Sequence, residues 1–308
     1  MPILVVGSVA LDDVETPFGQ RKRALGGAAV YFGLAASYFT DVRLVGVVGR
    51  DFPADHLDLL SSRGIDLAGL QTVDGKTFRW GGKYGYDFNA RETTFTDLGA
   101  FASFDPQIPD AFRKTPYVLL ANIHPRLQLD VLEQVERPEV AGLDTMNYWI
   151  ERTPEELRAV LARVDILLIN DSEVRQLADE PVLLKAAERI LEMGPDLLVA
   201  KKGEDGAVVF SQEGIFAVPG LPLDSIVDPT GAGDSFAGGF MGYLAATGDR
   251  SPEGIRRATI YGSTMGSLCC EAFSTEKLVD LEPQEIEERF QQYKRLTHFE
   301  HAPIQLHA

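Results

Sequence analysis

The residues best suited to chemistry lie in the stretch DPTGAGDSFAGGF, which runs from 228 to 240. Three small residues, Gly231, Ala232 and Gly233, stand directly before Asp234. The apolar residues that follow recur at every fourth position and predict a helix: Phe236, Phe240 and Leu244. Small residues at a helix N-terminus leave unpaired N–H groups open to an anion, which the helix dipole also favours. The stretch therefore predicts a phosphate-binding backbone at 231–233.

Asp234 would repel such an anion unless it has a task of its own. A carboxylate in this place can accept the proton of an attacking hydroxyl group. Phosphoryl transfer requires a positioned base, amides around the transferred group and a magnesium ion. The competing interpretation for Asp234 alone is an ordinary helix N-cap after a glycine turn.

The rest of the chain predicts an α/β protein, because short apolar runs alternate with amphipathic helical patterns. The runs are apolar throughout, so the sheet should be mostly parallel and covered by helices on both faces, in three layers. We expect one domain over residues 1–308. The predicted strands are Ile3–Val9, Arg43–Val48, Tyr117–Ala121, Val140–Leu143, Ile166–Ile169 and Leu197–Ala200, and the predicted helices include Phe52–Arg63, Pro154–Arg163 and Leu183–Glu192.

One region lacks the helical period. Residues 67–104 are rich in β-formers, aromatic residues and glycine, which predicts a small inserted β-sheet, joined by residues 14–25. An insertion of this kind covers a site as a lid or pairs with another chain, so we expect a lid and a homodimer formed through it.

Composition restricts the partners. The chain has 46 acidic and 29 basic residues among 308, a net charge of -17, which argues against nucleic acid or an anionic membrane as a partner. The first apolar run is too short to span a membrane and lacks a basic leader, so we predict a cytoplasmic protein. The two cysteines, Cys269 and Cys270, are adjacent and are expected to be core thiols.

The stretch 228–240 resembles the second signature of the ribokinase-like sugar kinases, the PfkB carbohydrate kinase family. Four further segments resemble parts of that family in the same order: VVGSVALDD, LGGAAVYFGLAAS, INDSE and KKGEDGAVVF. The resemblance covers nearly the whole chain. It implies a ribokinase-like fold and an enzyme that uses ATP and Mg²⁺.

The resemblance also implies roles for the residues around the acceptor. Asp234 becomes the catalytic base, and the amides of residues 231–234 become an anion hole. Asp12 binds substrate hydroxyls, helped by the backbone of Gly26 and Gly27, which also act as a lid hinge. Asp12 follows a strand at the edge where ligands bind in open α/β sheets. Taken alone, it equally well starts a turn.

On the nucleotide side, Asn170 and Glu173 are implied to bind Mg²⁺ through water, although a helix capping box explains the same pair. Lys201, Gly203 and Gly206 are implied to line the nucleotide, with a hairpin turn as the alternative for the glycines. Thr230 is also implied to line the nucleotide. Together with Asp228, it corresponds to positions that hold K⁺ in some relatives.

The chain departs from the family at the acceptor. Tyr31 stands where many sugar kinases have asparagine, and Ala10 replaces another polar residue. Tyr31 and the lid aromatics could stack on a nucleobase, although packing within the lid explains the latter: Trp80, Tyr84, Tyr86 and Phe88. Three basic lid residues could instead meet a sugar phosphate: Arg79, Lys83 and Arg91.

We therefore predict an ATP-dependent kinase acting on a hydroxyl of a sugar or nucleoside. The alternatives are a nucleoside kinase similar to adenosine kinase, and a non-catalytic ligand-binding protein on the same scaffold. A dehydrogenase is a more distant alternative, because the dinucleotide-binding glycine pattern is absent.

Overall fold

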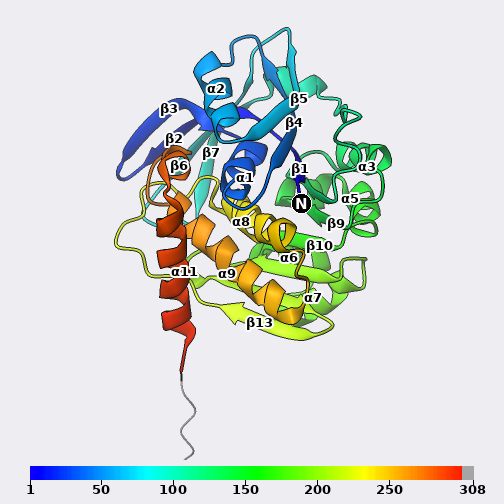
Figure 1. Cartoon of the computed structure of the whole chain (residues 1–308), viewed down its shortest axis with the longest axis vertical. Helices are drawn as coiled ribbons and strands as arrows, with labels where there is room; N and C mark the ends of the chain where they lie inside the picture. The colour runs from blue at the N-terminus through cyan, green and yellow to red at the C-terminus, as the bar shows by residue number, and fades with distance from the viewer. Residues whose placement is uncertain (300–308) are drawn as a thin grey trace, which may run out of the picture.

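The computed structural model describes residues 1–299, and its centre is a nine-stranded sheet (Figure 1). The strand order is β13-β12-β11-β10-β9-β8-β1-β4-β5. Neighbours from β11 to β5 are parallel, and β12 and β13 extend the sheet as an antiparallel edge. The strands are β1 (Ile3–Val6), β4 (Val42–Gly49), β5 (Ile65–Val73), β8 (Tyr117–Leu120), β9 (Val140–Leu143), β10 (Ile166–Asn170), β11 (Leu197–Lys201), β12 (Ala207–Ser211) and β13 (Gly214–Val218).

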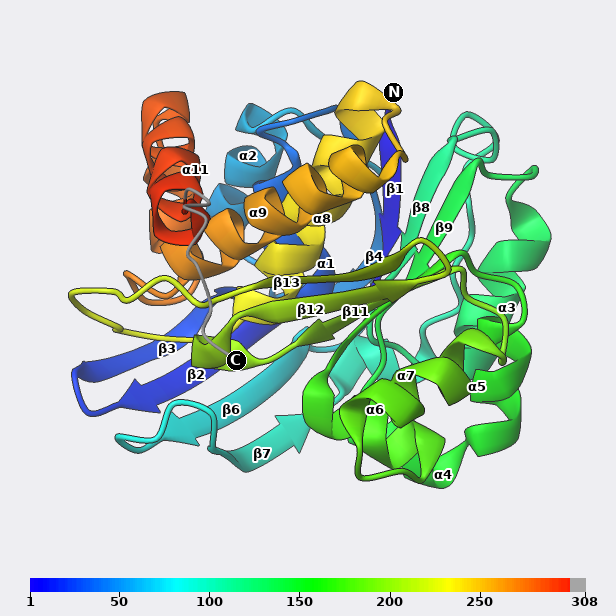
Figure 2. The ribbon, with the colours of Figure 1, turned by 90° about the horizontal axis from the view of Figure 1, so that it is seen from below.

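Helices cover both faces of this sheet, which confirms the three-layer prediction (Figure 2). Side chains of β1 alternate between two apolar cores: Ile3 and Val5 enter one, Leu4 and Val6 the other. One core is closed mainly by α1 (Ala28–Ala36), α2 (Ala54–Ser62), α8 (Ala232–Thr247), α9 (Pro252–Cys269), α10 (Glu276–Asp280) and α11 (Pro283–Thr297). The other is closed by α3 (Pro125–Gln134), α4 (Asn147–Arg152), α5 (Pro154–Leu161), α6 (Asp171–Ala178) and α7 (Leu183–Leu191).

A separate four-stranded sheet has the order β3-β2-β6-β7 and lies beside the main sheet (Figure 2). Its strands are β2 (Ala10–Thr16), β3 (Gly19–Gly26), β6 (Phe78–Tyr84) and β7 (Arg91–Asp97). We call it the lid sheet. The predicted lid began too early at 67, because β5 pairs with β4 as far as Val73 and so belongs to the main sheet.

Most predicted elements are confirmed within a few residues, because each has a buried apolar period of its own. The first predicted strand, Ile3–Val9, is divided: β1 ends at Val6, and the lid strand β2 starts at Ala10. A short connection thus joins the main sheet to the lid sheet. None of the helices formed by residues 1–299 is long and apolar enough to cross a membrane.

The glycines inside α8 hold this helix between two others. A Cβ on Gly238 would lie 2.5 Å from the carbonyl oxygen of Phe32 in α1, and a Cβ on Gly239 would lie 2.5 Å from that of Tyr261 in α9. Only hydrogen at both positions allows such close helix packing. The helix whose first turn carries the signature residues is thereby fixed between α1 and α9.

Candidate active site

The signature residues form the first turn of α8. Gly231 is the N-cap, with a left-handed φ of 77°, and a Cβ there would lie 2.2 Å from the ring of Tyr31. Asp234 is the third residue of the helix and makes no capping hydrogen bond. The interpretation of Asp234 as an ordinary N-cap is therefore wrong.

The backbone amides of this turn are mostly unpaired. Among the described residues, the N–H groups of Gly231, Gly233 and Asp234 have no hydrogen-bond acceptor, whereas that of Ala232 donates to the carbonyl of Pro229 at 3.1 Å. The prediction that Ala232 contributes to the anion hole is wrong in this respect, because its amide closes the turn. The remaining amides point from a helix N-terminus, which suits a phosphate.

The Asp234 carboxylate is half-buried and accepts no hydrogen bond from another described residue. Burial, and then the nearby Asp144 carboxylate, raise its pKa to about 7, against the opposing effect of Lys201 and Arg91. A carboxylate with this pKa takes up a proton readily near neutral pH. The geometry therefore suits a general base.

Asp12 lies in the lid strand β2 and is 4% exposed. Its Oδ2 would be 1.9 Å from a Cβ on Gly26, and a Cβ on Gly27 (φ 96°) would be 2.5 Å from the carbonyl oxygen of Ser8. Both glycines are thus required by the protein itself, where β3 passes into α1. Burial, and then the Asp228 charge, raise the pKa of Asp12 to about 8.

Tyr31 differs from its predicted role. Its side chain is 1% exposed, and the ring packs under Gly231, so no ring face is available to a nucleobase. Its hydroxyl has no hydrogen-bond partner among the described residues. Burial, then the charges of Asp12 and Asp228, raise its pKa well above the usual value. The stacking prediction for Tyr31 is therefore wrong.

The carboxyl ends of β9, β10 and β11 bring together a second group of charges. Lys201 ends β11, and its ammonium lies 3.1 Å from the carboxylate of Asp144, which directly follows β9. The sequence interpretation missed Asp144. The signal was present, because Asp144 is a carboxylate just past the end of a predicted strand, Val140–Leu143, as Asp12 was expected to be.

Asn170 and Glu173 form a complete capping box at the start of α6. The Glu173 N–H donates to Asn170 Oδ1 at 2.8 Å, and the Asn170 N–H donates to Glu173 Oε2 at 2.9 Å. Glu173 Oε1 has no protein donor among the described residues, so it can still accept from a metal-bound water. Burial, then Asp144, raise the pKa of Glu173 to about 7.

These donors fit Mg²⁺ only as an outer shell. Within residues 1–299, no group of three or more His, Cys, Asp or Glu side chains could hold a metal ion. Mg²⁺ keeps several waters and is commonly bound through phosphates with one or two carboxylates. The residues present are compatible with a water-mediated ion on a nucleotide.

Gly203 (φ 57°) and Gly206 (φ 95°) flank the short 3₁₀ turn Gly203–Asp205 after β11. A Cβ on Gly206 would lie 2.1 Å from the Val218 carbonyl, and one on Gly203 would lie 2.2 Å from Asn89 Oδ1. Asn89 belongs to the lid connection between β6 and β7. Packing within the protein therefore explains both glycines without a ligand.

Asp228 and Thr230 precede the signature turn. Asp228 is fully buried, and its two oxygens accept from the N–H groups of Thr230 and Ser274, each at 2.9 Å. The Thr230 hydroxyl donates to the hydroxyl of Tyr84 in the lid sheet at 3.2 Å. The lid sheet is thus linked directly to the residue before the anion hole.

The lid sheet has two chemically different faces. Trp80 is in register with Asp12 on the neighbouring strand, and neighbours in register point to the same side of a sheet. Arg91, in register with Tyr84, places its guanidinium 5.0 Å above the Trp80 ring. This face, which carries Asp12, Trp80, Tyr84 and Arg91, is called the inner face.

Arg79 and Lys83 occupy the other face. Arg79 pairs with Asp13 at 3.0 Å and Lys83 pairs with Glu15 at 2.6 Å. Both cations are therefore neutralised on the side away from Asp12. Arg91 alone of the three predicted phosphate-binding residues lies on the inner face.

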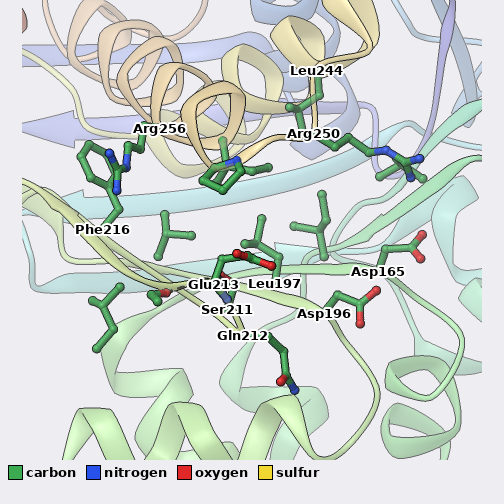
Figure 3. A pocket seen from close by; sticks show the side chains of 17 residues that line it. Asp165, Asp196, Leu197, Ser211, Gln212, Glu213, Phe216, Leu244, Arg250 and Arg256 are labelled. Carbon is green, nitrogen blue, oxygen red and sulfur yellow. Dashed lines mark hydrogen bonds between the residues drawn. The ribbon is translucent and has the colours of Figure 1, made fainter.

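A cavity of about 380 Å³ lies at the opposite edge of the main sheet (Figure 3). The first residues of β9, β10 and β11 line it, with Arg250 and Arg256 at its rim. None of the predicted site residues lines this cavity. The chemistry described above therefore belongs to the carboxyl edge of the sheet.

Comparison with known proteins shows the family of this chain. The chain matches the model of the pfkB family carbohydrate kinases over residues 3–280. It is 32% identical over 251 residues to the cytidine kinase of Thermococcus kodakarensis, covering 79% of this chain and 88% of that protein.

Two solved structures have the same fold. The nucleoside kinase of Methanocaldococcus jannaschii, an archaeal member of the ribokinase family, gives a TM-score of 0.77 at 21% identity, covering 94% of this chain and 98% of that one. An E. coli protein solved with ATP and Mg²⁺ gives a TM-score of 0.77 at 19% identity, covering 94% and 99%. With the family model spanning nearly the whole chain, this protein belongs to the pfkB family of carbohydrate kinases, which transfer a phosphoryl group to a hydroxyl of a sugar or nucleoside.

Proposed function

We propose that this kinase phosphorylates a ribose hydroxyl of a nucleoside, with Asp234 as the base. The observation that carries the catalytic part is the Asp234 carboxylate, which has no protein donor, on the same helix turn as three unpaired amides. The acceptor oxygen forms a bond to the γ-phosphorus while its proton passes to Asp234. The bond to the β–γ bridging oxygen breaks, and its electron pair leaves with ADP.

In this proposal the unpaired amides of Gly233 and Asp234 stabilise the charge on the transferred group. Bound Mg²⁺ neutralises the nucleotide phosphates. Glu173, through Oε1, and Asn170 would orient its water shell, while Lys201 and the turn at Gly203 and Gly206 would line the nucleotide.

The nucleoside acceptor is supported by the inner face of the lid sheet. The Trp80 indole lies flat over Gly82, where a Cβ would be 2.0 Å from the ring. Trp80 is in register with Asp12 on the neighbouring strand. Asp12 would bind ribose hydroxyls while the base takes the place of the Arg91 guanidinium over the Trp80 ring. A cytidine kinase among the relatives supports the same acceptor class. The sugar-phosphate alternative is disfavoured, because Arg79 and Lys83 are paired on the other face.

ADP release over a panel of acceptors tests this proposal. We expect at least one of cytidine, uridine, adenosine or inosine to exceed ribose, fructose and myo-inositol in kcat/KM by about a hundredfold, since base contacts add to ribose binding. Ribose equal to every nucleoside would overturn the nucleoside assignment. Binding of these ligands without any ADP release would instead favour the non-catalytic alternative.

Truncation of Trp80 tests the base contact. Trp80→Ala should raise KM for the preferred nucleoside by about 5- to 100-fold, the range of a lost stacking contact, and leave KM for ATP unchanged. Tyr86→Ala is the matched control, because Tyr86 is a lid aromatic that is 88% exposed. Equal effects of the two substitutions would argue against a base at Trp80.

The raised pKa of Asp234 predicts a pH profile. Only the ionised carboxylate accepts a proton, so kcat at saturating acceptor should fall about tenfold per pH unit below about 7 and level off above it. The rate is measured from pH 5.5 to 8.5, with Tm recorded at each pH to exclude unfolding. A flat profile across this range would contradict the assignment of Asp234 as base.

The proposal also includes a K⁺ site and a homodimer. A K⁺ ion beside Asp228 would neutralise a carboxylate that is fully buried and bonded only to amides. Two chains would associate through their lid sheets, where Phe18 is 59% exposed and stacks on Phe88. The cytoplasmic location stays a prediction from the sequence.

A further inference from the structure

Lys201 and Asp144 form a buried ion pair that spans the end of β10. Lys201 ends β11, Asp144 follows β9, and β10 lies between these strands. The side chains are 15% and 9% exposed, at an N–O distance of 3.1 Å. Burying such a pair costs hydration that its attraction often fails to offset, so stability alone is a weak reason for it.

The same ammonium lies against the anion hole. A Cβ built on Gly233 would be 3.3 Å from Lys201 Nζ, and its next two contacts would also be atoms of the Lys201 side chain. Gly233 is the second residue of α8, and its N–H has no acceptor among the described residues. A phosphoryl group bound at this amide therefore lies beside the ammonium.

The Lys201 ammonium has hydrogen-bond donors that the protein does not use. An ammonium carries three N–H donors, and within residues 1–299 only Asp144 accepts from Nζ. Burial lowers the pKa of Lys201, but Asp144 and Asp234, followed by Glu173, raise it more, so the group stays charged. Its charge is held in place and directed at the first turn of α8.

We propose that Lys201 is a catalytic residue that contacts the transferring phosphoryl group at the Gly233 amide, and that Asp144 is the residue that positions it. The inference rests on the kinase function proposed above. As the bond to the acceptor oxygen forms and the bond to the leaving ADP oxygen breaks, negative charge on the γ-phosphoryl oxygens meets the ammonium. Lys201 keeps its proton throughout, since Asp234 receives the only proton that is transferred.

Lys201→Gln tests this role by two readouts. We expect kcat to fall about a hundredfold or more, the effect of losing one preorganised donor, while KM for the acceptor changes less than about threefold. In calorimetric titration we expect the wild-type protein to bind Mg²⁺–AMP-PNP more tightly than Mg²⁺–ADP, because the Lys201 ammonium meets the terminal phosphoryl, and we expect Lys201→Gln to lose this difference. Lys201→Arg, which retains the charge, should recover part of both losses.

Lys202→Gln is the matched control. Lys202 is the next residue, and its ammonium pairs with Asp205 at 3.6 Å, away from the contact with Gly233. This variant should keep kcat and the AMP-PNP preference. Asp144→Asn should lower kcat about tenfold, because the ammonium remains charged but is no longer held. If Lys201→Gln does not fold, Asp144→Asn decides the question by the same two readouts.

The titration separates this inference from the proposed function. A wild-type protein that makes no ADP with any acceptor contradicts the proposed function, whereas the AMP-PNP preference still reports on Lys201. An unchanged preference together with kcat within about threefold of wild type in Lys201→Gln overturns the catalytic role. The ion pair would then be structural only, with its effect confined to Tm.

Discussion

Asp234→Asn is expected to lower kcat by about a thousandfold or more while nucleotide binding is retained. Asparagine has nearly the same shape, and the Asp234 carboxylate makes no hydrogen bond to another described residue that the change would break. Removing a negative charge beside unpaired amides should leave the Kd of Mg²⁺–ATP equal or lower. Single-turnover rates and calorimetric titration of the same preparation measure both quantities.

Asp196→Asn is the control for this substitution. Asp196 lies at the opposite edge of the same sheet, where it lines the cavity of Figure 3, so its loss should leave kcat unchanged. Activity of Asp234→Asn within about tenfold of wild type would remove the base from the proposed mechanism. The kinase would then depend on the amides and cations alone.

Asp12→Asn is expected to lower kcat/KM for the acceptor by about a hundredfold and, at the same time, to stabilise the protein. Above about pH 8, where Asp12 is ionised, its carboxylate can accept from two neighbouring hydroxyls, whereas the amide offers one acceptor. The stabilisation arises because Asp12 is 4% exposed and its pKa is raised to about 8. Steady-state kinetics and thermal unfolding measure the two effects.

The sign of the stability effect depends on pH. Between about pH 4 and pH 8, the folded state keeps a proton on Asp12 that the unfolded state releases, so this group lowers stability as pH rises through that window. Asparagine removes the dependence. The gain in Tm should therefore amount to several degrees at pH 8 and become small near pH 4.

Asp13→Asn provides the comparison, because Asp13 is the adjacent carboxylate and pairs with Arg79 at 3.0 Å. Its replacement should leave Tm equal or lower and should not affect the acceptor. If Asp12→Asn lost stability at pH 8, the buried carboxyl would be stabilising, contrary to this account. A combined loss of affinity for the acceptor and gain in Tm is the result expected of a binding residue that destabilises the folded protein.

Local sequence was sufficient for the strands, most helices and the first turn of α8. Each central strand is an apolar run buried on both faces, so its position follows from residues a few places apart. The small residues before Asp234 likewise indicate a helix N-terminus without reference to the rest of the chain. The three-layer fold and the position of Asp234 in the first turn of α8 were predictable for that reason.

Contacts between distant segments were not predictable in this way. Asp144 and Lys201 are 57 residues apart, and only the strand order β11-β10-β9 brings them together over the end of β10. The first lid bound was wrong because the choice between the two sheets depends on pairing partners, which β-forming residues do not specify. Burial of Tyr31 under Gly231 depends on the position of α8 relative to α1.

The sequence by itself therefore determined the chemistry available to this protein: a helix N-terminus with amides for an anion and a carboxylate for a proton. Only the tertiary structure decided which amides stay unpaired, which charges surround the carboxylate and which lid residues share a face with Asp12. The reason is physical. Helix and strand formation depend on neighbours along the chain, whereas burial, pKa and ion pairing depend on neighbours in space.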